Sequence, residues 1–186
     1  MFAGFIILRL RNILGRKTGH QVKPMSRYFP RGMETLQVIE NNEAIKSGNV
    51  DEEAKKQFLK GADIAYEQII TAFSKGDKKS LKSLLGKEMY EDFSEVIDER
   101  KKKDHNYETT FIGVKSSKVL EFKKIENIYK VTVNFVSEII TCVKDKNNKV
   151  IEGNPDVIKT VNDVWKFSKN MWSQDPTWYL VETSNK

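Results

Sequence analysis

Residues 129–143 read YKVTVNFVSEIITCV, and this stretch decides the fold. Apolar side chains recur at every second position, as at Val131, Val133 and Phe135, with polar side chains such as Asn134 between them. A period of two residues is typical of a β-strand that buries one face and exposes the other. The stretch therefore predicts a long strand whose apolar face covers the core.

Further strands are predicted on both sides of this stretch. The segments 109–114 and 118–122 form either a strand pair or one long strand with a kink at Ser116 and Ser117. The polar run DKNNK at 145–149 has the composition of a hairpin turn. Residues 161–171 and 178–181 supply the last two strands, with a turn at Asp175 and Pro176 between them.

Before residue 104 the apolar residues follow the period of helices. From Phe58 to Phe73 they recur at intervals of three or four residues, which places them on one helix face. Asp51 is the expected N-cap of this helix, and Gly76 is expected to end it. A short helix after Asp77 and a longer one over about residues 87–103 are predicted to follow.

Helices followed by antiparallel strands predict an α+β domain. We expect N-terminal helices packed on a curved antiparallel sheet of about four strands. The 155 residues after Arg31 suffice for a core without disulfides. The single cysteine, Cys142, lies in an apolar run and is predicted to be a buried side chain rather than a reactive thiol.

The first 31 residues form an arm that carries the net charge of the protein. The arm has seven Lys and Arg and no acidic residue, whereas the remaining 25 Lys and Arg are matched by all 26 Asp and Glu. Residues 1–14 are expected to associate with a membrane, residues 15–50 to form a basic linker, and residues 51–186 to form the folded domain. The residues expected at the bilayer are Phe2, Phe5, Ile6, Ile7, Leu8, Arg9, Leu10, Arg11, Arg16 and Lys17.

The order of residues in the arm leaves two kinds of partner open. Arginines follow the apolar residues, whereas a secretory signal has its positive charges first. The arm is therefore expected to lie on an anionic membrane or to be the end of a single N-terminal anchor. Alternatively, the arm contacts single-stranded RNA, because basic residues beside aromatic ones are typical of such contacts: Lys23, Arg27 and Arg31 lie beside Tyr28 and Phe29. A ribosomal partner is therefore a second hypothesis. No DNA partner is expected.

The sequence contains no recognisable catalytic or metal-binding motif. The two histidines, His20 and His105, have no Cys, Asp or Glu at the spacing of metal ligands, and no glycine-rich phosphate loop occurs. Glu138 and Asp163 lie within predicted strands, and a buried carboxyl in a sheet concavity is the one feature that would favour acid–base chemistry. We expect a protein that is not an enzyme and that holds no cofactor.

The aromatic residues of the predicted sheet, Trp165, Trp172 and Trp178 among them, are expected to form the core. They are also of the kind that lines an apolar pocket for an acyl chain or a peptide, so lipid or small-ligand binding is a further alternative. The candidate pocket residues are Phe58, Ala62, Tyr66, Ile69, Phe93, Val133, Phe135 and Trp165.

Several segments together resemble bacterial Tim44-like proteins. They are the arm FIILRLRNILGRKTG at 5–19, the helix from FLKGA at 58–62 to IITAF at 69–73, the strand VNFVSEI at 133–139, and the closing segments DVWKF at 163–167 and SQDPTWYLV at 173–181. The resemblance covers almost the whole chain in the order expected for the family. It implies a fold similar to nuclear transport factor two and cystatin, with an apolar pocket beneath the sheet.

The resemblance also implies a role in protein transport. The mitochondrial member of the family tethers an import chaperone to the presequence translocase and binds the inner membrane, and relatives with the same domain act at the ribosome. We therefore expect a non-enzymatic protein that assists protein translocation, membrane insertion or assembly, with anionic lipid and a chaperone, translocase or ribosome as partners. The expected location is the cytoplasmic face of a bacterial inner membrane, in an alphaproteobacterium.

Overall fold

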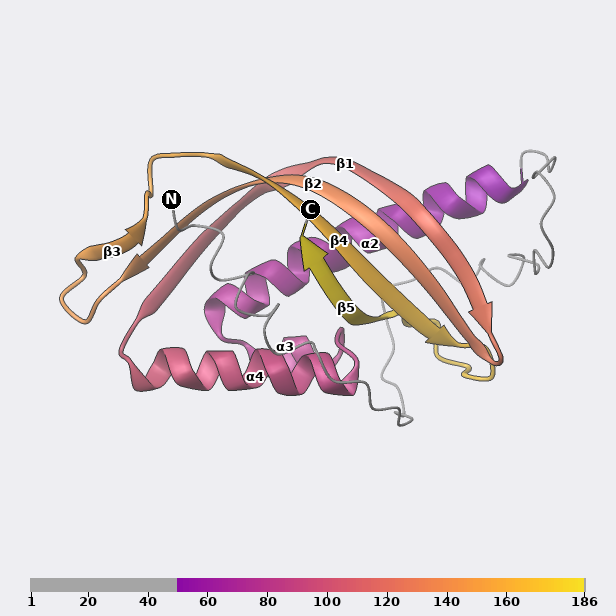
Figure 1. The fold of residues 1–186 in the computed structure, drawn as a ribbon, viewed down its shortest axis with the longest axis horizontal. Helices are drawn as coiled ribbons and strands as arrows, with labels where there is room; N and C mark the ends of the chain where they lie inside the picture. The colour runs from indigo at the N-terminus through magenta and orange to yellow at the C-terminus, as the bar shows by residue number, and fades with distance from the viewer. Residues whose placement is uncertain (1–49, 186) are drawn as a thin grey trace.

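The computed structural model describes residues 50–185, and the arm and most of the linker lie outside them. Within these residues three helices come first and the strands follow (Figure 1). In chain order the elements are α2 (Val50–Lys75), α3 (Lys78–Lys82), α4 (Lys87–Lys102), β1 (Asn106–Ile125), β2 (Ile128–Lys144), β3 (Val150–Gly153), β4 (Lys159–Asn170) and β5 (Tyr179–Asn185).

The strands form one antiparallel sheet in the order β1-β2-β4-β5, and the short strand β3 pairs with the end of β2. The sheet is strongly curved, and the helices lie on its concave side (Figure 1). This arrangement confirms the predicted α+β class and the four main strands. The sequence pattern did not reveal β3, because its four residues are too few to show a period.

Strand β2 is the centre of the sheet and confirms the predicted alternation. Val131, Val133, Phe135, Ser137 and Ile139 are all buried on the face that covers the helices, and the residues between them are more exposed. Successive side chains of a strand point to opposite faces, so this parity fixes which residues enter the core.

Strand β1 resolves the alternative left open by the sequence, because it is one strand of 20 residues. Its register against β2 shifts at three places, and one of them, between Val114 and Ser116, adjoins the predicted kink. Such bulges bend a strand and increase its twist, which gives the sheet part of its curvature. Exposed lysines on β1, such as Lys115 and Lys118, discourage a further strand from pairing with this open edge.

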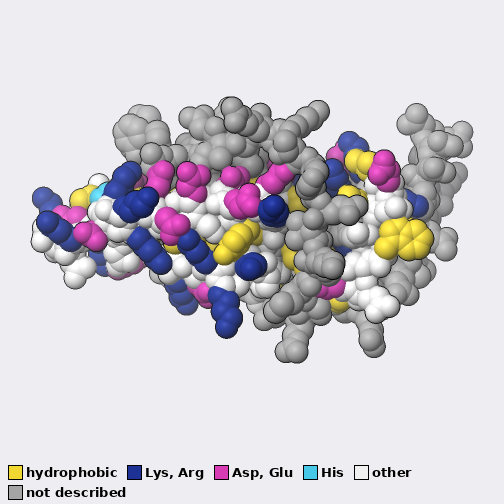
Figure 2. Space-filling model, turned by 90° about the horizontal axis from the view of Figure 1, so that it is seen from below, with side chains coloured by type: hydrophobic (Ala, Val, Ile, Leu, Met, Phe, Trp, Pro, Cys, Tyr) yellow, Lys and Arg dark blue, Asp and Glu magenta, His cyan; other side chains and the backbone are white. Residues whose placement is uncertain are grey.

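The helix boundaries follow from local chemistry in all but one case: α2 already includes Val50, so Asp51 lies inside the helix and is not its N-cap as predicted. After α2, Gly76 has φ +68°, a conformation that glycine adopts without strain, and this ends the helix as predicted. The side chain of Asp77 accepts hydrogen bonds from the backbone N–H groups of Lys79 and Ser80 and so caps α3. The outward face of α4 carries interspersed basic and acidic side chains (Figure 2).

One aromatic residue departs from the prediction. Trp172 was expected among the core aromatics of the sheet, but its side chain is 77% exposed. Strand β4 ends at Asn170, and the Asn170 side chain accepts a hydrogen bond from the backbone N–H of Trp172, which starts a turn. Trp172 also has the opposite parity to the buried residues Trp165 and Phe167, so even a longer strand would not have turned its side chain into the core.

The end of β3 gives the first testable prediction. Gly153 has φ +80°, and a Cβ atom added there would lie 2.3 Å from the carbonyl oxygen of Thr141. Gly153→Ala is therefore expected to lower the free energy of unfolding by at least about 1–2 kcal/mol, because L residues are strained at positive φ. Gly113→Ala is the matched control, since a Cβ there meets nothing within 4 Å. Equal midpoints of urea denaturation for the two variants would contradict the account.

Candidate functional site

The eight predicted pocket residues come together between the helices and the concave face of the sheet. All of them are buried members of one hydrophobic cluster, from Phe58 on α2 to Trp165 on β4. Phe135 and Trp165 pack against the ring of Tyr66, with ring centroids 4.5 and 4.4 Å from its own. A ligand at this place would have to displace these aromatic rings, and the pocket stays a prediction.

A cluster of three polar side chains lies inside this core. Tyr66 comes from α2, Ser137 from β2 and Asp163 from β4, and each has 0% of its surface exposed. The Tyr66 hydroxyl donates a hydrogen bond of 2.6 Å to Oδ2 of Asp163 and lies 2.9 Å from Oγ of Ser137. Since the single phenolic proton goes to the carboxylate, Ser137 donates to the Tyr66 oxygen.

The electrostatics of this cluster are dominated by burial. Desolvation raises the pKa of Asp163 to about 6, although the hydrogen bond from Tyr66 acts in the opposite direction. Desolvation and the neighbouring carboxylate also raise the pKa of Tyr66, so its hydroxyl stays protonated. Within the described residues, Oδ1 of Asp163 has no hydrogen-bond partner, so the cluster holds a carboxyl group that charges only at some cost.

The two acidic residues that suggested acid–base chemistry do not meet. Asp163 points into the core, whereas Glu138 follows Ser137 on β2 and points to the outer face of the sheet. There Glu138 forms an ion pair of 2.7 Å with Lys115. A pair of carboxylates working on one substrate must lie on the same side of the sheet, so these two side chains cannot form such a pair.

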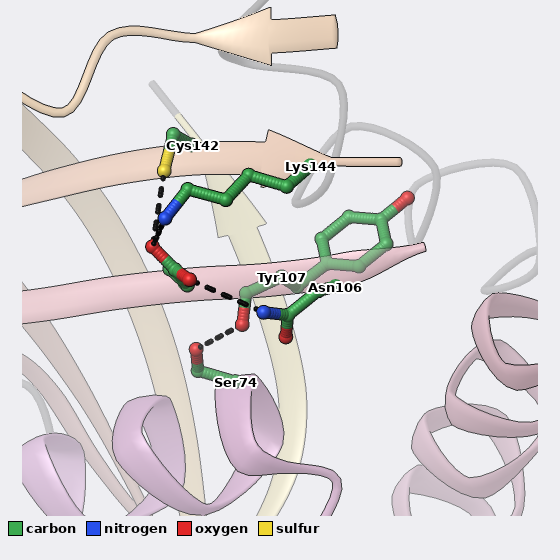
Figure 3. A network of polar contacts seen from close by, with 6 residues as sticks. Ser74, Asn106, Tyr107, Cys142 and Lys144 are labelled. Atoms are coloured by element: carbon green, nitrogen blue, oxygen red, sulfur yellow. Dashed lines mark hydrogen bonds and ion pairs between the residues drawn. The ribbon is translucent and has the colours of Figure 1, made fainter. Parts of the chain in front are cut away.

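A second polar network lies on the other face, where β1 begins and β2 ends (Figure 3). The carboxylate of Glu108 accepts hydrogen bonds from Lys144 at 2.6 Å, from Asn106 at 3.1 Å and from the Cys142 thiol at 3.5 Å. Burial and the nearby carboxylate raise the pKa of Cys142, which keeps the thiol protonated and a poor nucleophile. Cys142 is 4% exposed, which confirms that it is a buried residue.

An open groove of about 650 Å³ runs along the first half of α2. Its lining contains side chains of both charges and one leucine: Glu52, Glu53, Lys55, Lys56, Leu59, Lys60 and Asp63. Because the three acids balance the three lysines, the groove has no preference for a ligand of one sign. It was not predicted, since its charged residues had the ordinary character of an exposed helix face and Leu59 packs against the core.

Sequence parity would have identified the buried polar cluster. Ser137 lies between Phe135 and Ile139 on the inward face of β2, and Asp163 shares the parity of Trp165 on β4. A polar residue at a core position needs a partner, and this requirement is the signal that the predicted buried carboxyl of Asp163 belongs to a polar cluster with Ser137. The ten predicted membrane-binding residues of the arm lie outside the described residues.

Two features are absent from residues 50–185. No three His, Cys, Asp or Glu side chains in this part of the chain gather closely enough to hold a metal ion. Over the same residues, no helix combines the length and the apolar character that crossing a bilayer requires.

Comparison with known proteins adds a family and one relative. The family model described as "Tim44-like domain" matches residues 49–185. The Caenorhabditis elegans protein named "Probable mitochondrial import inner membrane translocase subunit tin-44" is 25% identical over 124 residues, which cover 61% of this chain and 28% of that protein. The chain thus matches less than a third of the length of its nematode relative.

Two solved structures are similar at a lower level. The intermembrane space region of the chloroplast protein ARC6 has a TM-score of 0.48 and 15% identity, and the match covers 68% of this chain and 94% of that chain. A conserved protein from Planctomyces limnophilus has a TM-score of 0.37 and 13% identity, with 72% of this chain and 99% of that chain covered.

Proposed function

The chain belongs to the Tim44-like domain family, and from this premise we propose that it is a membrane-associated protein that assists protein translocation, insertion or assembly. The observation that carries the proposal is the family match over residues 49–185, together with a relative named as a translocase subunit. In this proposal the domain acts by binding lipid and a protein partner, and it performs no catalysis.

The arm supplies the membrane contact in this proposal. Its apolar residues, such as Phe5 and Ile6, enter the interface, and Arg9, Arg11, Arg16 and Lys17 meet anionic headgroups. The proposed location is the cytoplasmic face of a bacterial inner membrane, where the leaflet attracts basic segments. The folded domain then faces the cytoplasm and presents its surface to a chaperone, a translocase or a ribosome.

Neutralising the four basic residues of the arm tests this account. Replacing Arg9, Arg11, Arg16 and Lys17 together by glutamine is expected to move the protein from the membrane fraction to the soluble fraction. Each charge near an anionic surface contributes about 1 kcal/mol, so four charges decide the binding of a marginal anchor. The control variant removes the same amount of charge from the folded domain by replacing four other lysines with glutamine: Lys55, Lys56, Lys78 and Lys79. Unchanged pelleting of the arm variant would rule out the electrostatic account.

A ribosome or RNA partner is the second candidate, and basic residues beside aromatic ones favour it. Lys23, Arg27 and Arg31 flank Tyr28 and Phe29, a composition that suits stacking on unpaired bases. Co-sedimentation with ribosomes and flotation with membranes over a salt series separate the two candidates. Binding to RNA weakens steeply as the salt concentration rises, whereas a protein held by an inserted apolar segment stays bound to the membrane.

A further inference from the structure

One end of the sheet exposes apolar side chains that the core does not use. The turn between β1 and β2 and the first residues of the β4–β5 loop lie side by side there (Figure 1), and the backbone N–H of Met171 donates a hydrogen bond of 2.9 Å to the carbonyl of Asn127. We call residues 121–130 and 168–172 the sheet tip. Ile125 and Ile128 face each other across its turn and are 47% and 39% exposed, and Trp172 is 77% exposed.

The sheet tip is also basic. It contains four lysines and only two acidic residues, which gives a net charge of +2: Lys123, Lys124, Lys130 and Lys169 against Glu121 and Glu126. Lys123 and Lys130 are direct cross-strand neighbours, and like charges in that position repel each other, although Glu121 pairs with Lys123. A surface of negative charge placed against the tip would relieve this repulsion.

We propose that the sheet tip docks on an anionic lipid surface, with Ile125, Ile128 and Trp172 entering the headgroup region. Indole rings favour the boundary between headgroups and acyl chains, and lysines keep their ammonium groups among the phosphates while their alkyl stems cover apolar atoms. The tip combines three exposed apolar side chains with a net positive charge. The boundary of an anionic bilayer offers the matching combination, acyl chains beside negative headgroups, so the tip suits a lipid surface better than a protein.

The inference rests on the proposed function, because it adds a second lipid contact to a chain that the arm already holds at the membrane. Two weak contacts on one chain act together: once the arm is bound, the tip meets the same surface at a high effective concentration. The tip would also set the orientation of the domain, since the strands β1 and β2 would then rise from the membrane.

The tryptophans of the chain allow a direct measurement. Trp165 and Trp178 are 4% and 2% exposed, so Trp172 is the residue whose fluorescence senses the solvent. The full chain is mixed with vesicles of phosphatidylcholine and phosphatidylglycerol in equal amounts, some of which carry brominated acyl chains. We expect a blue shift and quenching by the brominated lipid, both absent from Trp172→Phe. If vesicle-bound and free protein have the same emission spectrum, the proposal is wrong.

A binding assay with matched variants completes the test. The double variant Ile125→Ser/Ile128→Ser is expected to bind the same vesicles about tenfold more weakly, because apolar burial scales with area. The control is Ile151→Ser/Val157→Ser, which removes side chains of similar exposure, 48% and 45%, outside the tip. If both double variants bind as tightly as the wild type, the sheet tip is not a lipid contact and the arm proposal stands. If the full chain binds no vesicle, both proposals fail.

Discussion

Tyr66→Phe is expected to lower the free energy of unfolding by about 2–3 kcal/mol above pH 7, although it removes a single oxygen atom. The lost hydroxyl is the donor to Oδ2 of Asp163 at 2.6 Å, and Oδ1 of the same carboxylate already has no partner among the described residues. The variant therefore leaves a buried charge without any side-chain donor. Urea denaturation followed by circular dichroism measures the effect.

The cost of this substitution should depend on pH. Burial raises the pKa of Asp163 to about 6, so the carboxyl is ionised above that pH and protonated below it. A hydrogen bond to an ionised group is worth more than one to a neutral group, and we expect the cost of Tyr66→Phe to fall to about 1 kcal/mol near pH 5. A cost that stays constant between these pH values would show that the carboxyl does not titrate there.

Asp163→Asn checks the same assignment from the other side. A carboxyl whose pKa is raised in the folded state stabilises the fold most below its unfolded pKa, and this contribution is lost as the pH rises through about 6. The wild type should therefore gain about 2–3 kcal/mol relative to Asp163→Asn as the pH falls from about 7 to 4. Tyr129→Phe is the control for Tyr66→Phe, because it also removes a tyrosine hydroxyl, here from a ring packed on Phe122. It should change the free energy of unfolding little.

Much of this fold could be predicted because burial repeats regularly along each element. The alternation in β2 and the helical stripe from Phe58 to Phe73 reflect single faces turned to one core, and both were read correctly from residue type. The cap at Asp77 and the stop at Gly76 are local in the same sense, since their hydrogen bonds and dihedral angle involve near neighbours only.

The features that escaped prediction depend on contacts between distant residues. Tyr66 and Asp163 are 97 positions apart, and no local period pairs them. The shifts of register in β1 arise from the fit of two strands. Trp172 is exposed because it lies beyond the end of β4, in a turn whose backbone donates a hydrogen bond to the Asn170 side chain. The membrane proposal for the arm rests on composition, which does not specify a geometry.

Arg100 is a buried cation whose position follows from the helix stripe. It continues the inward series Met89, Phe93 and Ile97 on α4 and is only 8% exposed. Its guanidinium carbon lies 3.8 Å from the ring centroid of Phe73 and 4.1 Å from that of Tyr107. Within the described residues no carboxylate forms an ion pair with it, and desolvation lowers its pKa to about 10, which leaves it charged at neutral pH.

Neighbouring groups other than a carboxylate stabilise the charge of Arg100. The Nη1 group donates a hydrogen bond of 3.2 Å to the carbonyl of Phe73, which lies in the last turn of α2, where the helix dipole favours a positive charge. Two aromatic faces add cation–π attraction, worth about 1–2 kcal/mol each when water is excluded. We therefore expect Arg100→Ala to lower the free energy of unfolding by about 3 kcal/mol, through lost packing as well as lost charge.

Arg100→Lys separates the charge from the planar group that carries it. An ammonium ion is compact and strongly hydrated, so it cannot stack between the rings of Phe73 and Tyr107 as a guanidinium does. The lysine variant should therefore recover less than half of the loss caused by alanine, and Lys101→Ala, on the exposed side of the same helix, should cost little. Full recovery by lysine would mean that the positive charge alone stabilises this site, and that the two aromatic faces serve only as apolar packing.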